Sequence, residues 1–170
     1  MRFGLLILAV VSMAGCATGQ VPQTASEFRE AFQTQRTGMF AKITRIEVYE
    51  TSRSFADVYR TLADRAPACL DTTVTESRIL GGQMHASRTT FVPKLNQTGR
   101  TNAELTIQVP GRVKNPSDGM YIMLVDVVGA AGGGTALTVY GRKAEGYIFD
   151  ALDRWAAGND LSCPTMKASA

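Results

Sequence analysis

Apolar residues recur with helical spacing in three segments of the chain, and each segment is predicted to form an amphipathic helix. The clearest is 54–66, where Ser54 stands at the N-cap position and Pro67 is expected to end the helix. A shorter helix is predicted in the segment TASEFREAFQTQR, which begins at Thr24, and the last over 144–157. The apolar stripes, in chain order, are Phe28 and Phe32; Phe55, Val58, Tyr59, Leu62 and Ala66; and Tyr147, Ile148, Ala151, Leu152 and Trp155, with Gly158 at the C′ position of the last helix.

Alternating apolar and polar positions predict several strands. In the segment 43–49, Ile46 and Val48 lie on the face opposite Arg45 and Glu47. The most apolar segment, MYIMLVDVV, is expected to lie at the centre of the sheet. Together with 43–49, strands are predicted over 72–79, 87–92, 103–109, 120–128 and 135–140, with turns at Gly81-Gly82, 96–101 and 129–134.

The predicted order of elements is strand, helix, about five strands and helix. A run of consecutive strands between two helices is typical of an antiparallel sheet with helices packed on one face. The sequence therefore predicts an α+β fold with about five to six antiparallel strands and two helices on one face. This order resembles the helix-grip (START-like) architecture over about residues 43–160, a resemblance of topology that implies no residue roles.

The first 15 residues have a positive start at Arg2 and an apolar run too short to span a bilayer, which is typical of a secretory signal. The residues SMAG before Cys16 resemble the lipobox of bacterial lipoproteins, with Met13 where the family usually has Leu. That resemblance implies cleavage before Cys16 and a diacylglycerol on its sulfur. Ala17 replaces the Asp that retains many lipoproteins in the inner membrane, which implies the outer membrane, facing the periplasm. The alternative is an ordinary signal peptide that leaves Cys16 as a free thiol.

These observations divide the chain into five segments. The stretch from FREAF to RAPACL is also similar to proteobacterial lipoproteins of no established activity. The predicted segments are a signal peptide (1–15), the lipidated cysteine with a tether (16–23), a short helical segment (24–42), an α+β domain (43–163) and a tail (164–170).

Composition narrows the classes of function. Of the 170 residues, 45% are hydrophobic and 19% are charged, as in an ordinary globular domain. The net charge of +3 falls to +2 when residues 1–15 and their Arg2 are removed, and this small, dispersed charge argues against nucleic acid as a partner. A single histidine leaves little material for a metal site, so no metal or cofactor is expected.

Two of the three cysteines are predicted to form a disulfide. Cys69 follows the helix 54–66, and Cys163 follows the last helix. Both helices are expected on the same face of the sheet, so their C-terminal ends can meet in an oxidising periplasm. A redox-active or metal-binding pair is the alternative, but the chain has no CxxC spacing to support it.

Few residues indicate catalysis. His85 lies beside a Gly-Gly turn without a serine elbow in the chain and is interpreted as a surface histidine. The run GAAGGG has no following Lys, as a phosphate-binding loop requires, and is interpreted as a hairpin loop. Asp126 interrupts the most apolar strand, so it lies either on the solvent face, which we favour, or buried beside a partner.

The sequence favours a non-enzymatic interaction module of the bacterial cell envelope, whose partner is another envelope protein. The alternatives are a carrier or sensor that binds an apolar small molecule or lipid between the sheet and the last helix, and, less favoured, a hydrolase. An open cavity there would favour the carrier, whereas a filled core with an exposed apolar patch would favour the interaction module. The candidate ligand or contact residues are Tyr121, Met123, Tyr147 and Trp155.

Overall fold

The structure is a computed structural model that describes residues 21–34, 42–111 and 116–168. The elements follow in the order α1 (Ala25–Thr34), β1 (Thr44–Thr51), α3 (Phe55–Leu70), β2 (Thr72–Leu80), β3 (Gln83–Gly99), β4 (Asn102–Val109), β5 (Met120–Gly129), β6 (Thr135–Arg142), the 3-10 helix η1 (Lys143–Glu145) and α4 (Gly146–Ala157). Within the described segments, no helix combines the length and the apolar character needed to cross a membrane.

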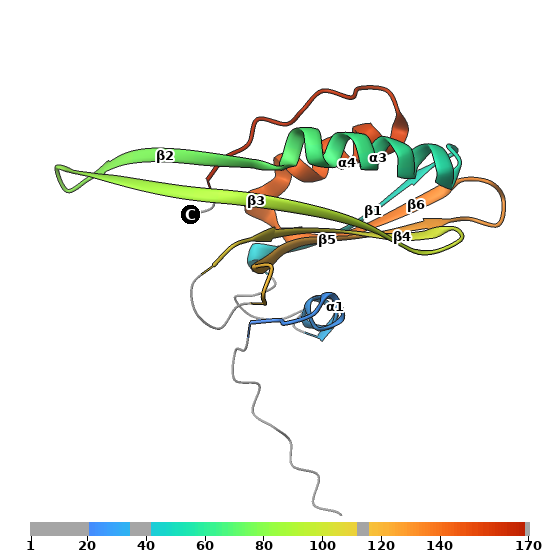
Figure 1. The fold of residues 1–170 in the computed structure, drawn as a ribbon, viewed down its shortest axis with the longest axis horizontal. Helices are drawn as coiled ribbons and strands as arrows, with labels where there is room; N and C mark the ends of the chain where they lie inside the picture. The colour runs from blue at the N-terminus through green and yellow to red at the C-terminus, as the bar shows by residue number, and fades with distance from the viewer. Residues whose placement is uncertain (1–20, 35–41, 112–115, 169–170) are drawn as a thin grey trace, which may run out of the picture.

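The six strands form one antiparallel sheet in the order β1-β6-β5-β4-β3-β2. Helices α3 and α4 lie together on one face, here called the inner face, and α1 lies on the opposite, outer face (Figure 1). The predicted α+β fold, helix-grip-like with two helices on one face of an antiparallel sheet, is confirmed. The apolar strand β5 lies inside the sheet, as its composition predicts, because both of its faces are covered.

The main core fills the space between the inner face and the two helices. Trp155 and Phe149 of α4 and Leu62 of α3 are fully buried there. The predicted apolar stripes of α3 and α4 both supply residues to this core, because side chains three or four apart point to the same side of a helix. The buried sheet residues of this core are Phe91, Ala103, Leu105, Ile107, Ile122, Met123, Val125, Val127, Leu137 and Val139.

Helix α3 begins where the sequence predicts and ends later than predicted. The hydroxyl of Ser54 accepts a hydrogen bond from the backbone N–H of Asp57 at 3.2 Å. The expectation that Pro67 ends the helix is wrong, because Pro67 lies inside it. Leu70 is fully buried and Cys69 is held by a disulfide, so the packing of the last turn outweighs the hydrogen bond that proline cannot donate.

Strand β1 has the predicted alternation, and its apolar residues face away from the main core. Ile46 and Val48 lie on the outer face, where their exposed fractions are 38% and 59%. The polar set lies on the inner side, where the Arg45 guanidinium carbon is 4.6 Å from the centre of the Phe149 ring. Glu47 accepts hydrogen bonds from both Arg45 and Tyr49. β1 is an edge strand beside α4, and long side chains with polar ends cover the margin of a core in this way.

Helix α1 packs on the outer face through its two phenylalanines. Phe28 and Phe32 are buried against Leu124 of β5 and Tyr140 of β6, which are neighbours in the register. The ring centres of Phe28 and Phe32 are 4.8 Å apart, and that of Phe28 is 5.8 Å from that of Tyr121. The predicted helix therefore docks on the sheet through Phe28 and Phe32.

Candidate functional site

The most prominent surface feature is a hairpin that extends beyond the body of the protein, formed by β2 and the first half of β3 (Figure 1). We call residues 75–88 of this hairpin the arm. β3 pairs with β2 over its first nine residues and with β4 from Val92 onward. The arm is thus a direct continuation of β3, which pairs with β4 in the body of the sheet, into solvent.

Local sequence explains why the arm forms. Gly81 and Gly82 form its two-residue turn with φ of 58° and 80°, a left-handed conformation that glycine adopts without strain and that matches the twist of a hairpin. Threonines dominate its base, where the hydroxyls of Thr73 and Thr90 lie 2.9 Å apart across the strands. β-Branched residues of this kind favour the extended backbone.

The tip of the arm exposes two large apolar side chains. Ile79 and Met84 face each other across the strands, and their exposed fractions are 75% and 77%. No other large hydrophobic side chain among those described is as exposed. Because burial of such side chains in a partner is favourable, an exposed pair at the end of a projection indicates a contact site.

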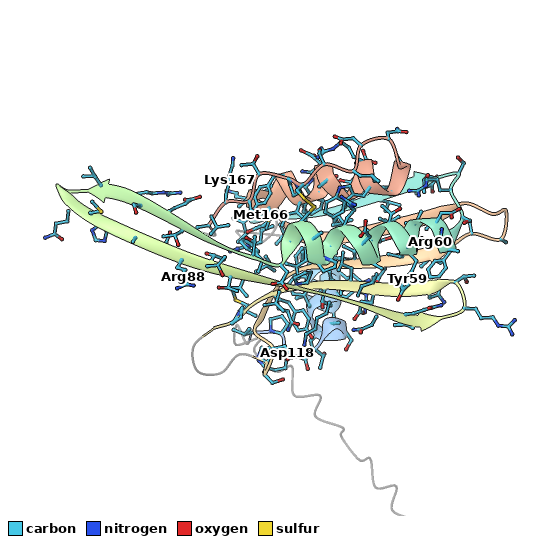
Figure 2. The ribbon with its side chains drawn as sticks, turned by 45° about the horizontal axis from the view of Figure 1, so that its top comes forward. Tyr59, Arg60, Arg88, Asp118, Met166 and Lys167 are labelled. Atoms are coloured by element: carbon cyan, nitrogen blue, oxygen red, sulfur yellow. A yellow bond between two sulfur atoms is a disulfide. The ribbon has the colours of Figure 1, made fainter. Side chains whose placement is uncertain are left out.

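The tail after α4 returns along the helix and is tied down at several points. The predicted disulfide joins Cys69, at the end of α3, to Cys163, with 5.1 Å between the two Cα atoms. The indole N–H of Trp155 donates to the carbonyl of Ser162 at 3.1 Å, and the hydroxyl of Tyr147 donates to the carbonyl of Lys167 at 3.2 Å. The tail thereby reaches the base of the arm, as Figure 2 shows for Met166 and Lys167.

Two small hollows lie beneath this tail, and Tyr147 and Lys167 line both of them. The hollow at the arm base has a volume of about 180 Å³, and the one along α4 about 320 Å³. They lie at or below the low end of the size range of drug-sized ligand sites. The other lining residues are Glu76, Arg78, Ala144, Glu145 and Ala168 at the arm base, and Asp150, Arg154, Cys163, Pro164 and Thr165 along α4.

The smaller hollow has charged walls that are already engaged with one another. The buried carboxylate of Glu145 accepts a hydrogen bond from Arg142 at 2.7 Å. Glu76 accepts hydrogen bonds from the backbone N–H of Ala168 at 2.9 Å and from Arg78 at 3.1 Å. Burial raises the pKa of the Tyr147 phenol, so this hydroxyl stays protonated and acts as a donor to the tail. The arrangement fits a structural role in fastening the tail.

The four predicted ligand or contact residues do not form one surface. Close packing buries Met123 and Trp155 fully in the main core. The expectation that these two residues lie on a contact surface is therefore wrong. Tyr121 is half-buried beside Phe28 on the outer face, whereas Tyr147 lies under the tail. The sheet separates Tyr121 from the other three, because a register shift opposite Ile107 and Gln108 interrupts the alternation of β5 between Tyr121 and Met123.

The remaining positions singled out from the sequence are His85, the loop 129–134 and Cys16. His85 lies in the exposed arm, opposite Arg78. The predicted hairpin loop 129–134 joins β5 to β6, and Cys16 with the signal segment lies outside the described residues. The sequence analysis did not single out Ile79 and Met84. The signal was available, since each lies two residues from the Gly-Gly turn on a polar, threonine-rich hairpin.

Among the described residues, no group of three His, Cys, Asp or Glu side chains could hold a metal ion. No protein-family model matches the chain, and no curated protein matches it. A search of solved structures found similarity to the crystal structure of the di-domain ARO/CYC StfQ from the steffimycin biosynthetic pathway. That match is 13% identical, with a TM-score of 0.26, and covers 76% of this chain and 51% of that chain. This chain therefore spans about half the length of that structure, and a similarity of this size assigns no activity to it.

Proposed function

We propose that this protein is a non-enzymatic interaction module of the bacterial cell envelope. In this proposal a lipid on Cys16 anchors it to the outer membrane on the periplasmic side. The observation that carries the proposal is an apolar patch on the outer face, above a core that close packing fills. Three exposed side chains form it: Ile46 and Val48 of β1, and Val128 of β5, whose exposed fraction is 46%.

The register supports the patch as one continuous surface. Val48 faces Thr138 of β6, and Val128 faces Ala136 two residues earlier on the same strand. The small side chains of Thr138 and Ala136 therefore lie between the two valines across three neighbouring strands. An exposed apolar surface of this kind, with the carboxylate of Glu50 beside it, favours contact with a protein partner.

The packing gives less support to a carrier of an apolar ligand. The residues expected to line its cavity, Met123 and Trp155, have no exposed surface and pack directly into the main core. The hollows beneath the tail are small and have charged walls. Native mass spectrometry of the purified protein tests the alternative, since a bound molecule adds mass that disappears on denaturation.

Photocrosslinking in intact cells tests the proposed partner surface. A photoreactive amino acid at Val48 or at Val128 is expected to capture the same envelope protein. Arg60 on α3, whose side chain is 77% exposed, provides the control position on the opposite side of the sheet. The same capture at Arg60, or none at either valine, contradicts the proposal. Val48→Asp should also abolish capture at position 128, because a charge in the patch opposes apolar contact.

The anchor has its own test. Wild-type protein is expected to incorporate labelled fatty acid and to fractionate with membranes. Cys16→Ser removes the sulfur that the lipid would modify, so label incorporation should stop and the protein should be released or misprocessed. Unlabelled wild-type protein, with Cys16→Ser still found in membranes, rules out the lipoprotein interpretation.

A further inference from the structure

We propose that the tip of the arm inserts into the anionic headgroup surface of the membrane that carries the protein. The inference rests on the proposed function only for the anchor, which brings the arm close to lipid. It concerns different residues from the protein-binding patch: Ile79, Met84 and Arg88.

The arm has two unlike sides, because opposite residues in an antiparallel pair share a face. Ile79 and Met84 lie on one side with Ala86 and Arg88, and this side continues the outer face of the sheet. The other side carries Glu76, which is tied to the tail. The side with the apolar tip thus has a cation and no carboxylate.

The charges of the arm complement an anionic lipid surface. From Ser77 to Arg88 the chain has two arginines and one histidine, with no acidic residue. Arg78 pairs with Glu76, whereas no ion pair of Arg88 is found within the described part of the chain. Figure 2 shows Arg88 on the arm, away from the helices. An apolar tip with a basic side chain behind it is the arrangement that binds the boundary between headgroups and acyl chains.

The position of the proposed anchor also supports an orientation in which the apolar side of the arm faces the membrane. α1 lies on the outer face, and the eight residues 17–24 separate Cys16 from its first residue, Ala25. A chain of that length reaches at most about 30 Å. The lipid would therefore attach on the side of the sheet toward which Ile79 and Met84 are directed. We therefore propose the phospholipid surface, rather than a protein, as the binding partner of the arm.

Fluorescence quenching in vesicles tests the proposal. Trp155 is the only tryptophan and is fully buried, so a tryptophan introduced by Met84→Trp reports on the arm against a constant background. Val48→Trp, on the body, is the matched control, and the unsubstituted chain measures the background. Each full chain, as processed by cells, is mixed with vesicles of phosphatidylcholine and phosphatidylglycerol that contain lipids brominated near the top of the acyl chains.

Bromolipid is expected to lower the added emission of Met84→Trp by about twofold, with little change for Val48→Trp. Vesicles of phosphatidylcholine alone, high salt, or Arg88→Gln in the Met84→Trp chain should each weaken quenching, because each reduces the electrostatic attraction. Ile79→Asp should abolish it. Unquenched emission at position 84, or equal quenching at positions 48 and 84, overturns the proposal.

Two readouts separate this inference from the proposed function. Flotation of the chain with vesicles reports on the lipid anchor, whereas quenching at position 84 reports on the arm alone. A chain that floats while position 84 stays unquenched keeps its anchor and loses the arm inference. A photocrosslinker at Met84 that captures a protein in cells, with no quenching in vesicles, would assign the arm to a protein partner and also overturn the inference.

Discussion

Arg29 of α1 holds Asp126 of β5 through two hydrogen bonds, from Nε to Oδ2 at 2.9 Å and from Nη2 to Oδ1 at 2.6 Å. The same Nη2 lies 2.9 Å from a carboxylate oxygen of Glu104 on the neighbouring strand. These acceptors raise the pKa of the Arg29 guanidinium further above its already high ordinary value, so it remains charged. Asp126 therefore lies on the outer face, as favoured from the sequence, and is also paired, because α1 covers that part of the sheet.

Asp126→Asn is expected to lower the free energy of unfolding by about 1–2 kcal/mol, since it weakens a partly buried, charged hydrogen-bond pair. Urea denaturation measures the loss, and limited proteolysis should cleave near α1 faster. Asp153→Asn, at an exposed position on α4, is the control and should change little. Equal effects of the two substitutions would argue against a docking role for Asp126.

Replacement of both Cys69 and Cys163 by Ser is expected to cost about 4 kcal/mol in the chain-entropy account, because the disulfide closes a loop with a sequence separation of 94. Urea denaturation with and without dithiothreitol measures this. The reductant should destabilise the wild type to a similar extent and leave the double variant unchanged. A wild type unaffected by full reduction would show that the tail is held by its other contacts.

Trp155→Ala is expected to lower the free energy of unfolding by about 3–5 kcal/mol, because it opens a cavity at a fully buried position. Trp155→Phe retains much of the ring and removes the hydrogen bond to the Ser162 carbonyl, so it should cost less than the alanine substitution. A loss below about 1 kcal/mol for Trp155→Ala would contradict its place in the core.

Glu47 predicts a dependence of stability on acidity. The hydrogen bond from Arg45 is the main cause that lowers the pKa of the Glu47 carboxyl below its ordinary value of 4.5. The ionised Glu47 carboxylate therefore stabilises the fold at a pH above 4.5, and this stabilisation is lost as the pH falls through the lowered pKa of the folded protein. Between about pH 5 and pH 3, the wild type should lose more stability than Glu47→Gln. Denaturant titrations across this range measure the difference, with Glu50→Gln on the same strand as the control; parallel pH curves for wild type and Glu47→Gln would contradict it.

Much of the local structure follows from the sequence because it depends on neighbours in the chain. The hydroxyl of Ser54 caps α3 as its spacing predicts, and Gly158 ends α4 at a φ of 74°. The apolar periods predict which side chains share a face, and α3 and α4 bury those faces. The Cys69–Cys163 pairing was also predictable, since two helices on one face bring their C-terminal ends together.

Other features depend on contacts between distant segments, and only the tertiary structure decided them. A period of two shows that Ile46 and Val48 share a face of β1, but the position of α4 determines that this face is the outer one. Burial of Leu70 carries α3 past Pro67, against its local preference. The arm exists because β3 spans 17 residues and β4 only 8, so the start of β3 extends beyond the sheet with β2 as its partner. The periodicity of a strand shows which of its side chains share a face. Which face is buried, and whether the strand extends beyond the sheet, depends on the lengths and positions of the neighbouring elements.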